Sequence, residues 1–367
     1  MKSIGFIVNS RIPSWGGFRR GMRPHHLMTG WPDKSSPMHF MRFGWIADEV
    51  NKSGAVRYEL FRPWRSYDAV VFLKSMEFEC ADLAAKLKNS GTAVVFEANV
   101  DYYTTSGNDS LPRELVPLES QRESAIRMTK IANKVIASSR RLMEICREWN
   151  PRAAWVPDNI PDSWICGGGS PTGVREGRLQ LWWSGMPSKA GDLLAIEEVL
   201  RGWKNRVHLH LVTGDLDAAC QRMSQEPREA LQKLLAEVPH TLHRFRDIPS
   251  LLQNYRAGGF ILSPRQLGNP YNQSHTEWKI TLGMAVGLPA LASPQPSYRD
   301  VAVRSSHPGA VTLCEKQADW DHAFESAILN KDYAEKSAAA VDVVCRFYST
   351  SVVAQQHCRE ILEVVAA

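Results

Sequence analysis

The 367-residue sequence has no long hydrophobic run. A helix that crosses a membrane needs about 18 or more consecutive apolar residues, whereas the longest apolar runs here have the length of a strand, such as 69–73 and 94–96. The first residues, MKSIGFIVN, contain one cation, a short apolar run and no small-residue cleavage site, which is not the pattern of a signal peptide. We therefore expect a cytoplasmic protein, with contact at the inner face of the membrane as an open alternative.

The sequence also lacks the cysteine spacing of common metal and redox motifs. Its seven cysteines, at positions 80, 146, 166, 220, 314, 345 and 358, contain no C-x-x-C pair. The sequence contains no known nucleic-acid-binding motif and no dense stripe of basic residues, so we expect no nucleic-acid partner. The formal charge of +5 is mild and permits an anionic ligand without requiring one. We expect no cofactor and no essential metal.

What the sequence does contain is ordinary globular composition at two-domain length. Hydrophobic residues make up 44% and charged residues 23% of the 367 residues, which excludes a disordered chain. A chain of this length usually divides into two domains.

Strand-like apolar runs alternate with segments of helical period, a pattern typical of parallel α/β sheets. In the first half, this pattern predicts strands at 4–8, 58–61, 69–73, 92–96 and 135–137, and helices at 44–52, 77–88, 120–134 and 140–149. In the second half, it predicts strands at 179–183, 207–212, 241–243, 259–262 and 290–292, and helices at 191–200, 226–237, 248–254, 277–285, 320–329, 333–347 and 351–365.

The clearest break in this alternation is the Pro-Asp-Asn-Ile-Pro segment at 157–161, followed by three glycines at 167–169. We predict two Rossmann-like domains, at 1–160 and 161–347, and a C-terminal helix at 348–367 that returns to the first domain. Parallel sheets carry ligands at the carboxyl ends of their strands, so we expect the two domains to face a ligand-binding cleft.

Glycine and lysine follow several strands and favour phosphate binding. Gly16 and Gly17 follow the first strand, where a backbone without side chains can approach an anion, although a simple tight turn is the commoner explanation of this pair. Ser184 and Gly185 end a strand in the second half, and Lys189 lies in the loop that leads from them into a helix. A lysine at such a junction suits a diphosphate, but a solvated loop lysine explains this segment equally well.

The segment 274–293 combines a loop, a helix with polar residues in its first turn, a glycine stop and a buried strand. Lys279 is suited to phosphate oxygens, and Glu277 to the hydroxyls of a ribose or sugar. The alternative is that both are surface charges of a first helical turn. The full set that we assign to a phosphate-bearing ligand is Gly16, Gly17, Ser184, Gly185, Lys189, Gly214, Arg265, Ser274, Thr276, Glu277 and Lys279.

In their order along the chain, these segments resemble the glycosyltransferases of the GT-B fold, most of all the retaining transferases of family 4. The segment 156–160 resembles the family's hinge, Lys189 its phosphate-binding lysine, and 279–289, with the ending Met-Ala-x-Gly-x-Pro, its donor-site helix. The resemblance implies transfer of a sugar from a nucleotide-diphosphate sugar. It favours retention of the anomeric configuration over inversion. The acceptor would be a glycan, a lipid-linked molecule or a small molecule, in polysaccharide or natural-product biosynthesis.

The sequence departs from the family at three positions. Two glutamates that the family places eight positions apart are here Ser274 and Leu282, and the arginine that follows the glycine of its first C-domain loop is here Met186. Glu277 is a candidate for a displaced carboxylate. A sugar-nucleotide epimerase, another group transferase of this fold, or a binding protein with a decayed donor site are therefore kept as alternatives.

The acceptor side is less defined by the sequence. Glu97 and Asp101 follow the strand at 92–96, and either carboxylate is a candidate catalytic base if the reaction inverts configuration, with loop hydrogen bonding as the alternative role. We assign Arg19, Arg20, His25 and His26 to acceptor binding. The basic and aromatic residues between 11 and 45 also suit peripheral contact with a membrane, although a long, partly buried loop that lines the acceptor pocket is the somewhat commoner explanation.

Overall fold

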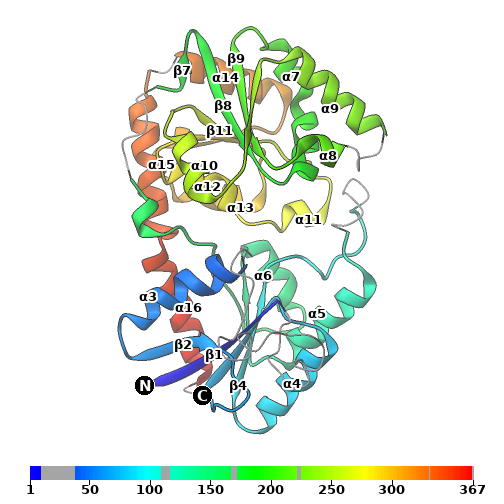
Figure 1. Ribbon diagram of the computed structural model, residues 1–367, viewed down its shortest axis with the longest axis vertical. Coiled ribbons are helices and arrows are strands. Elements are labelled where there is room, and N and C mark those ends of the chain that lie inside the picture. Colours follow the sequence, from blue (N-terminus) through cyan, green and yellow to red (C-terminus); the bar gives the residue numbers. More distant parts are fainter. Residues whose placement is uncertain (10–37, 109–115, 167–171, 221–224, 330, 366–367) are drawn as a thin grey trace. The chain divides into compact units, whose positions relative to one another are not determined.

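The computed structural model describes residues 1–9, 38–108, 116–166, 172–220, 225–329 and 331–365. The chain divides into two compact units (Figure 1). Of the described residues, those between 1 and 108, between 116 and 161 and between 348 and 365 form unit 1, and those between 162 and 347 form unit 2. Among the described residues, no helix combines the length and the apolar character that crossing a membrane requires.

Unit 1 is built on a parallel sheet with the strand order β2-β1-β3-β4-β5-β6. Its strands are β1 (Lys2–Val8), β2 (Val56–Leu60), β3 (Ala69–Leu73), β4 (Ala93–Ala98), β5 (Lys134–Ala137) and β6 (Ala153–Trp155). The side chains of a strand alternate between the two faces of its sheet. Ile4, Phe6 and Val8 accordingly lie in one apolar cluster, and Ile7 lies in another.

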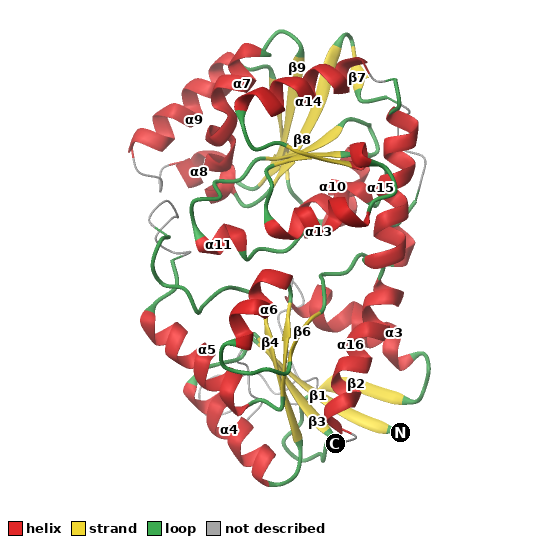
Figure 2. Cartoon of the chain, turned by 180° about the vertical axis from the view of Figure 1, so that it is seen from behind, coloured by secondary structure: helices red, strands yellow, loops and turns green. Residues whose placement is uncertain are grey.

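Helices cover both faces of this sheet (Figure 2). They are η1 (Met38–Gly44), α3 (Trp45–Asn51), α4 (Phe78–Asn89), α5 (Glu119–Ile131), α6 (Arg140–Arg147) and α16 (Thr350–Val365). The C-terminal helix α16 packs with α3 on the cluster that contains Ile4. Lys134 of β5 forms ion pairs with Glu360 and Glu363 of α16, so both apolar and charged contacts join this helix to unit 1.

The sheet of unit 2 has the strand order β10-β9-β8-β11-β12-β13, with β7 paired to β8 as an antiparallel hairpin. Its strands are β7 (Val174–Arg175), β8 (Arg178–Ser184), β9 (Val207–Thr213), β10 (His240–Arg244), β11 (Phe260–Ser263), β12 (Ala290–Ala292) and β13 (Val311–Leu313). The six strands on the main path pair in parallel, which places their carboxyl ends along one edge.

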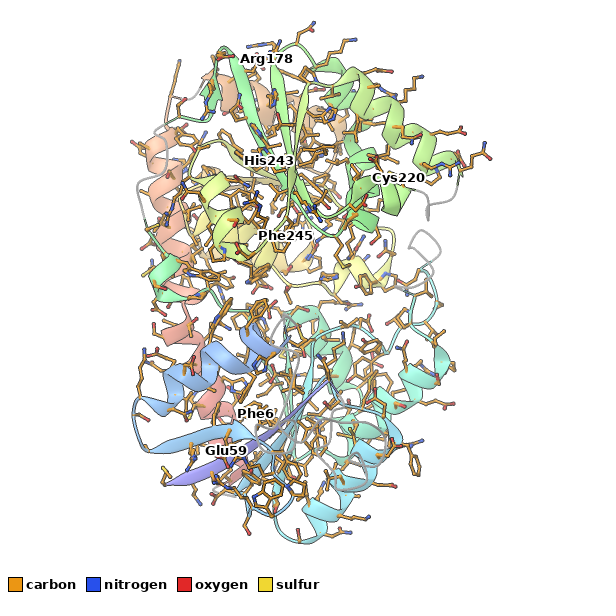
Figure 3. The ribbon with its side chains drawn as sticks, in the orientation of Figure 1. Phe6, Glu59, Arg178, Cys220, His243 and Phe245 are labelled. Carbon is orange, nitrogen blue, oxygen red and sulfur yellow. The ribbon has the colours of Figure 1, made fainter. Side chains whose placement is uncertain are left out.

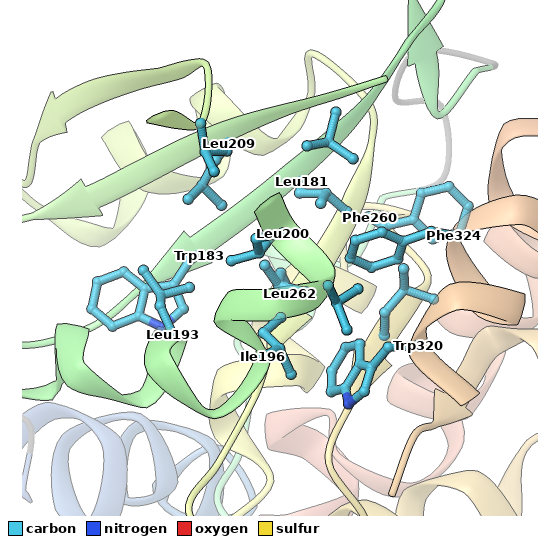
Figure 4. Packing of buried hydrophobic residues seen from close by; sticks show 14 of the residues in the cluster. Leu181, Trp183, Leu193, Ile196, Leu200, Leu209, Phe260, Leu262, Trp320 and Phe324 are labelled. Carbon is cyan, nitrogen blue, oxygen red and sulfur yellow. The ribbon is translucent and has the colours of Figure 1, made fainter. Parts of the chain in front are cut away.

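Unit 2 contains the remaining helices, and one large apolar cluster fills the space between several of them and the sheet. The helices are η3 (Asp162–Trp164), η4 (Pro187–Ile196), α7 (Glu197–Gly202), α8 (Leu216–Cys220), α9 (Gln225–Glu237), α10 (Ile248–Tyr255), α11 (Pro270–Gln273), α12 (Trp278–Met284), α13 (Pro296–Arg304), η5 (Pro308–Ala310), α14 (Gln317–Leu329) and α15 (Tyr333–Phe347). Leu181 and Trp183 of β8 belong to this cluster together with Leu193 of η4 and Phe324 of α14 (Figure 4).

The structure corrects several predicted elements. The helix predicted at 191–200 is a 3-10 helix, η4, followed by the short α-helix α7. The strands β6 and β13 and the helix α13 had no sequence prediction: the two strands have three residues each and show little alternation, and the start signal that Pro296 gives for α13 was overlooked. The helix predicted at 120–134 ends at Ile131, and Lys134 belongs to β5.

Three histidines lie on one face of the unit 2 sheet at β9 and β10. His210 stacks on Trp182 with ring centroids 4.0 Å apart, and its Nδ1 lies 3.1 Å from Nε2 of His243, which is labelled in Figure 3. Burial, helped by His208 and His243, lowers the pKa of His210 to about 3. Burial also lowers the pKa of His208 and of His243.

These histidines should make the protein acid-sensitive. The folded-state pKa of His210 lies below its ordinary value of 6.5, so its stabilisation is complete above pH 6.5 and is lost as the pH falls toward 3. Because the ring is partly exposed and screened, we expect wild type to lose about 1 kcal/mol more than His210→Gln between pH 7.5 and 5 in urea denaturation. The exposed His322→Gln serves as the control and should match wild type. Equal losses of stability in wild type, His210→Gln and His322→Gln would contradict the prediction that His210 makes the protein acid-sensitive.

Candidate functional site

The first part of the site is the turn that follows β8. Gly185 donates its amide to the Val212 carbonyl at 3.3 Å and accepts from Thr213 Oγ1 at 2.8 Å, while Ser184 Oγ accepts from Tyr255 at 2.7 Å. Pro187 then starts η4, a position where the missing amide hydrogen of proline has no cost. These contacts fix the turn from which Lys189 extends.

Glycines keep this turn close to the neighbouring strand end. A Cβ added to Gly185 would lie 3.2 Å from the Trp183 ring, and one added to Gly214 would lie 3.2 Å from Pro187 Cγ. The turns after β8 and β9 therefore approach each other where Gly214 follows its strand. The assignment of Gly185 and Gly214 to ligand binding stays a prediction, with close packing as its observed structural role.

Two lysines from different elements place their ammonium groups near this turn. Lys189 Nζ lies 3.2 Å from His275 Nε2 and 4.5 Å from the Tyr271 ring centroid. Lys279, which α12 carries, places Nζ 4.5 Å from the centroid of the Trp183 ring and 3.9 Å from the Cβ position of Gly185. Residues 90 positions apart in the sequence thus bring positive charge to one edge of the unit 2 sheet.

Arg265 adds a third cation from the loop after β11. Its Nη1 forms an ion pair with Asp192 Oδ2 at 2.9 Å, and its backbone amide donates to Ser293 Oγ at 2.9 Å. Burial alone would lower the pKa of Arg265, but Tyr298 and Asp192 raise it above its ordinary range. Its Nε is buried and has no hydrogen-bond partner in the part of the chain that the structure describes. The guanidinium therefore remains charged with a donor unused.

The cations of this cluster outweigh the opposing carboxylate. Burial and the Arg265 charge lower the pKa of Lys189 to about 7, and Asp192 opposes that shift. The pKa of Lys279 falls well below its usual value, first through burial and then through Arg265, with Asp192 again opposing and Lys189 adding to the fall. An anion at this position would restore the charged form of both lysines, because an opposite charge favours ionisation.

The other polar residues of the segment that carries Lys279 are mostly buried or held by contacts within the protein. Glu277 occupies the N-cap position of α12 and its side chain is completely buried, and Ser274 is 3% exposed at the end of α11. Thr276 uses its carbonyl to accept from Gln295 Nε2 at 3.4 Å. Leu282 is 1% exposed. Donor-binding roles for Ser274, Thr276 and Glu277 stay predictions.

The two candidate bases in unit 1 both have structural contacts. Glu97 is 0% exposed, and its carboxylate pairs with Arg42 Nε at 2.6 Å and His357 Nε2 at 3.2 Å. Asp101 is 2% exposed, and its Oδ1 accepts from the backbone amides of Tyr103 and Thr104 at 3.0 and 3.1 Å. Although burial would raise the pKa of Glu97, the charges of Arg42 and His357 lower it. The catalytic role predicted for these carboxylates remains a prediction.

Six predicted residues lie outside the described part of the chain: Gly16, Gly17, Arg19, Arg20, His25 and His26. Sequence reasoning also missed four residues that contact the predicted cations, namely Trp183, Asp192, Tyr271 and His275. Trp183 directly precedes the turn, and His275 lies inside the segment 274–293 that we selected from the sequence. Both could therefore have been predicted as site residues. Asp192 and Tyr271 gave no signal, because their roles depend on contacts far along the chain.

Comparison by sequence identifies no relatives: no family model matches the chain, and no curated protein matches it. Comparison of the fold with solved structures does find similar proteins. Anabaena HepE in complex with UDP-glucose has a TM-score of 0.62 at 11% identity, over 99% of this chain and 100% of HepE. Sucrose-phosphate synthase from Thermosynechococcus elongatus has a TM-score of 0.62 at 12% identity, over 92% of this chain and 81% of the synthase. A glycosyltransferase from Rickettsia africae ESF-5 has a TM-score of 0.58 at 11% identity, over 99% and 98%.

The chain has the GT-B fold. This result confirms the predicted fold class of two Rossmann-like α/β domains. Identities of 11–12% establish the fold and nothing finer. Membership of family 4 stays a prediction.

Proposed function

We propose that this chain is a glycosyltransferase that takes a sugar from a nucleoside-diphosphate sugar. The observation that carries the proposal is the cationic cluster of unit 2, in which three cations, Lys189, Lys279 and Arg265, interact with the carboxylate of Asp192 among the described residues. Charged groups leave water at a high cost unless an opposite charge compensates them. A diphosphate supplies the negative charge that this cluster lacks.

The two lysines come from different elements and can contact a diphosphate from two directions. Lys189 approaches from the 3-10 helix after β8, and Lys279 approaches from α12. Each charge-assisted hydrogen bond to a phosphate oxygen typically contributes about 1.5–3 kcal/mol. The position at the carboxyl ends of parallel strands is the usual ligand position in such sheets. The similar fold of HepE, whose structure contains UDP-glucose, supports the same ligand class here.

Retention of configuration is the outcome that we propose for the transfer. An inverting enzyme needs a carboxylate or other base that can reach the acceptor hydroxyl. Of the two carboxylates predicted for that role, Glu97 is enclosed by Arg42 and His357, and Asp101 accepts from two backbone amides. These contacts favour structural roles for both. The acceptor is proposed only by class, as a glycan, a lipid-linked molecule or a small molecule.

A second candidate function is donor binding without transfer. Ser274 and Leu282 stand at the positions where the resembling family has its two glutamates, and the buried Leu282 side chain cannot accept a hydrogen bond from a sugar. Such a protein would bind the donor through its cations but would not turn it over.

Ligand-induced stabilisation distinguishes these candidates from a protein that has no donor site. We expect UDP or another nucleoside diphosphate, at 100 times its dissociation constant, to stabilise the chain by about 2.7 kcal/mol in thermal unfolding. Uridine without phosphates should stabilise it far less, because the cationic cluster has no anion to bind. If no nucleoside diphosphate or diphosphate sugar shifts the melting temperature, the proposal fails.

Product analysis then tests for turnover. A transferase should release free sugar slowly from its bound donor when only water is present, whereas an epimerase would return a changed sugar nucleotide. A shift in melting temperature with neither product would identify the binding protein.

A further inference from the structure

The Lys189 ammonium lies between an imidazole and a phenol ring. Its Nζ is 3.2 Å from His275 Nε2 and 4.5 Å from the centroid of the Tyr271 ring. The two rings meet edge to face, with centroids 4.8 Å apart and an interplanar angle of 75°. Both contacts are attractive for a charged ammonium, since one offers a lone pair and the other the negative face of a π-system.

His275 is held in its neutral form. Burial and the positive charges of Lys189, Arg265 and Lys279 all lower its pKa well below the ordinary value. A neutral imidazole has one nitrogen that donates and one that accepts. When Lys189 is charged, its ammonium can only donate, so Nε2 then accepts from it and the ring proton is on Nδ1.

The charged and polar groups that face this pair come from four elements or loops. Lys279 lies on α12, Arg265 in the loop after β11, Asp192 on η4, and the titratable phenol of Tyr271 on α11. Arg265 and Lys279 oppose a further positive charge, whereas Asp192 favours one. The pair therefore has little tendency to hold an extra proton until an anion arrives.

We propose that His275 is a positioning residue that holds the Lys189 ammonium for phosphate binding, and that one proton is taken from solvent onto Lys189 when a nucleoside diphosphate binds. The proposal rests on the function proposed above. The proton is taken up without any change in the ligand, and the imidazole accepts one N–H of the ammonium while the remaining N–H groups can donate to phosphate oxygens.

The affinity for UDP should consequently depend on pH. Burial and Arg265 lower the pKa of Lys189 to about 7 in the free protein, and a bound dianion raises it again. Affinity should therefore be full below pH 7 and fall by up to about tenfold per pH unit above it. Ionisation of the terminal phosphate does not account for a fall in affinity above pH 7, because its own second pKa is about 6.

Two substitutions at one position separate positioning from a merely structural role. His275→Leu removes the acceptor at similar volume, so the charged form of Lys189 loses a partner and the fall in affinity should begin at lower pH. Relative to wild type, its UDP affinity should be about tenfold lower at pH 8 and less than threefold lower at pH 6. His275→Gln offers a carbonyl acceptor and should follow the wild-type profile. His322→Leu, at an exposed position of α14, is the control.

Calorimetric titration with UDP in two buffers of different ionisation enthalpy measures the proton directly. At pH 8, wild type and His275→Gln should take up at least about one proton, since Lys279 also regains its charge when the anion binds, and the heat should differ between buffers accordingly. An equal loss of affinity at every pH in both variants, or binding without proton uptake, would overturn the positioning role while leaving the donor site in place. The absence of UDP binding in wild type, together with no shift from any other nucleoside diphosphate, would instead remove the proposed function itself.

Discussion

Replacing Arg42 with methionine should lower the free energy of unfolding by about 3–5 kcal/mol, because it removes the arginine partner of the buried Glu97 carboxylate and leaves that carboxylate with His357. Both side chains are completely buried, and their Nε–Oε1 distance is 2.6 Å. Arg42 Nη1 also donates to the Val156 and Pro157 carbonyls at 3.1 and 2.6 Å. Urea denaturation at neutral pH measures the loss.

A double variant shows whether the loss comes from the unpaired charge. Arg42→Met combined with Glu97→Gln removes both charges and should recover at least half of the lost stability, since the two sites are in contact and their effects are not additive. Arg65→Met is the matched control, because Arg65 pairs with Glu59 at the surface and exposed ion pairs are worth about 0–1 kcal/mol. A loss in Arg42→Met no larger than in Arg65→Met would show that Glu97 finds another partner.

This network connects three distant parts of unit 1. Arg42 lies on η1, Glu97 on β4, and His357 on the C-terminal helix α16. Asn159 in the segment after β6 donates to the Met41 carbonyl at 2.6 Å and accepts from Thr350 at 2.6 Å. The buried charges therefore fix the segment 156–160 and α16 against the sheet, which is a structural use of the carboxylate that the sequence presented as a candidate base.

The fold was largely predictable because its signals are local. The strand β3 matches its predicted range of 69–73, and the apolar runs of the other long strands gave their positions within a few residues. The three-residue strands β6 and β13 were not predicted because their pairing partners, rather than their own pattern, decide their conformation. The equally short β12 was predicted, since it directly follows the turn residues Gly287 and Pro289. The pattern 191–200 was assigned to one helix, yet the chain changes there from 3-10 to α geometry at Glu197, and no residue type signals that change.

The candidate site was predictable only in part, because its contacts join residues distant in sequence. Lys189 and Lys279 could be selected from loop-to-helix junctions, and both lie near the turn after β8. The partner of Arg265 is Asp192, 73 positions away, and the partner of Lys189 is His275, 86 positions away. The role of Glu97 likewise depends on His357, 260 positions away, so a strand-end carboxylate looks catalytic until its partners are known.

Replacing Lys279 with alanine should weaken UDP binding by about ten- to hundredfold, the equivalent of one lost charge-assisted contact of roughly 1.5–3 kcal/mol. Its Nζ lies 3.9 Å from the Cβ position of Gly185, directly before Met186, where the resembling family has an arginine. Lys279 therefore brings from α12 a positive charge to the place where the resembling family has its arginine. Lys204→Ala, at an exposed position before β9, is the matched control and should bind UDP like wild type.

The same reasoning predicts a rescue. Met186 is 51% exposed, so Met186→Arg can be accommodated without rebuilding the core, and its guanidinium would return a cation to the turn. In the Lys279→Ala background, this change should recover at least tenfold in UDP affinity, measured by calorimetric titration at pH 6.5. Unchanged affinity in Lys279→Ala would remove Lys279 from the phosphate site. A loss that Met186→Arg does not recover would mean that the ammonium supports the Trp183 ring, 4.5 Å away, and not the ligand. Support of the Trp183 ring does not explain a rescue, since an arginine at position 186 extends from a different part of the chain than Lys279. A rescue would therefore show that the ligand needs a positive charge beside Gly185.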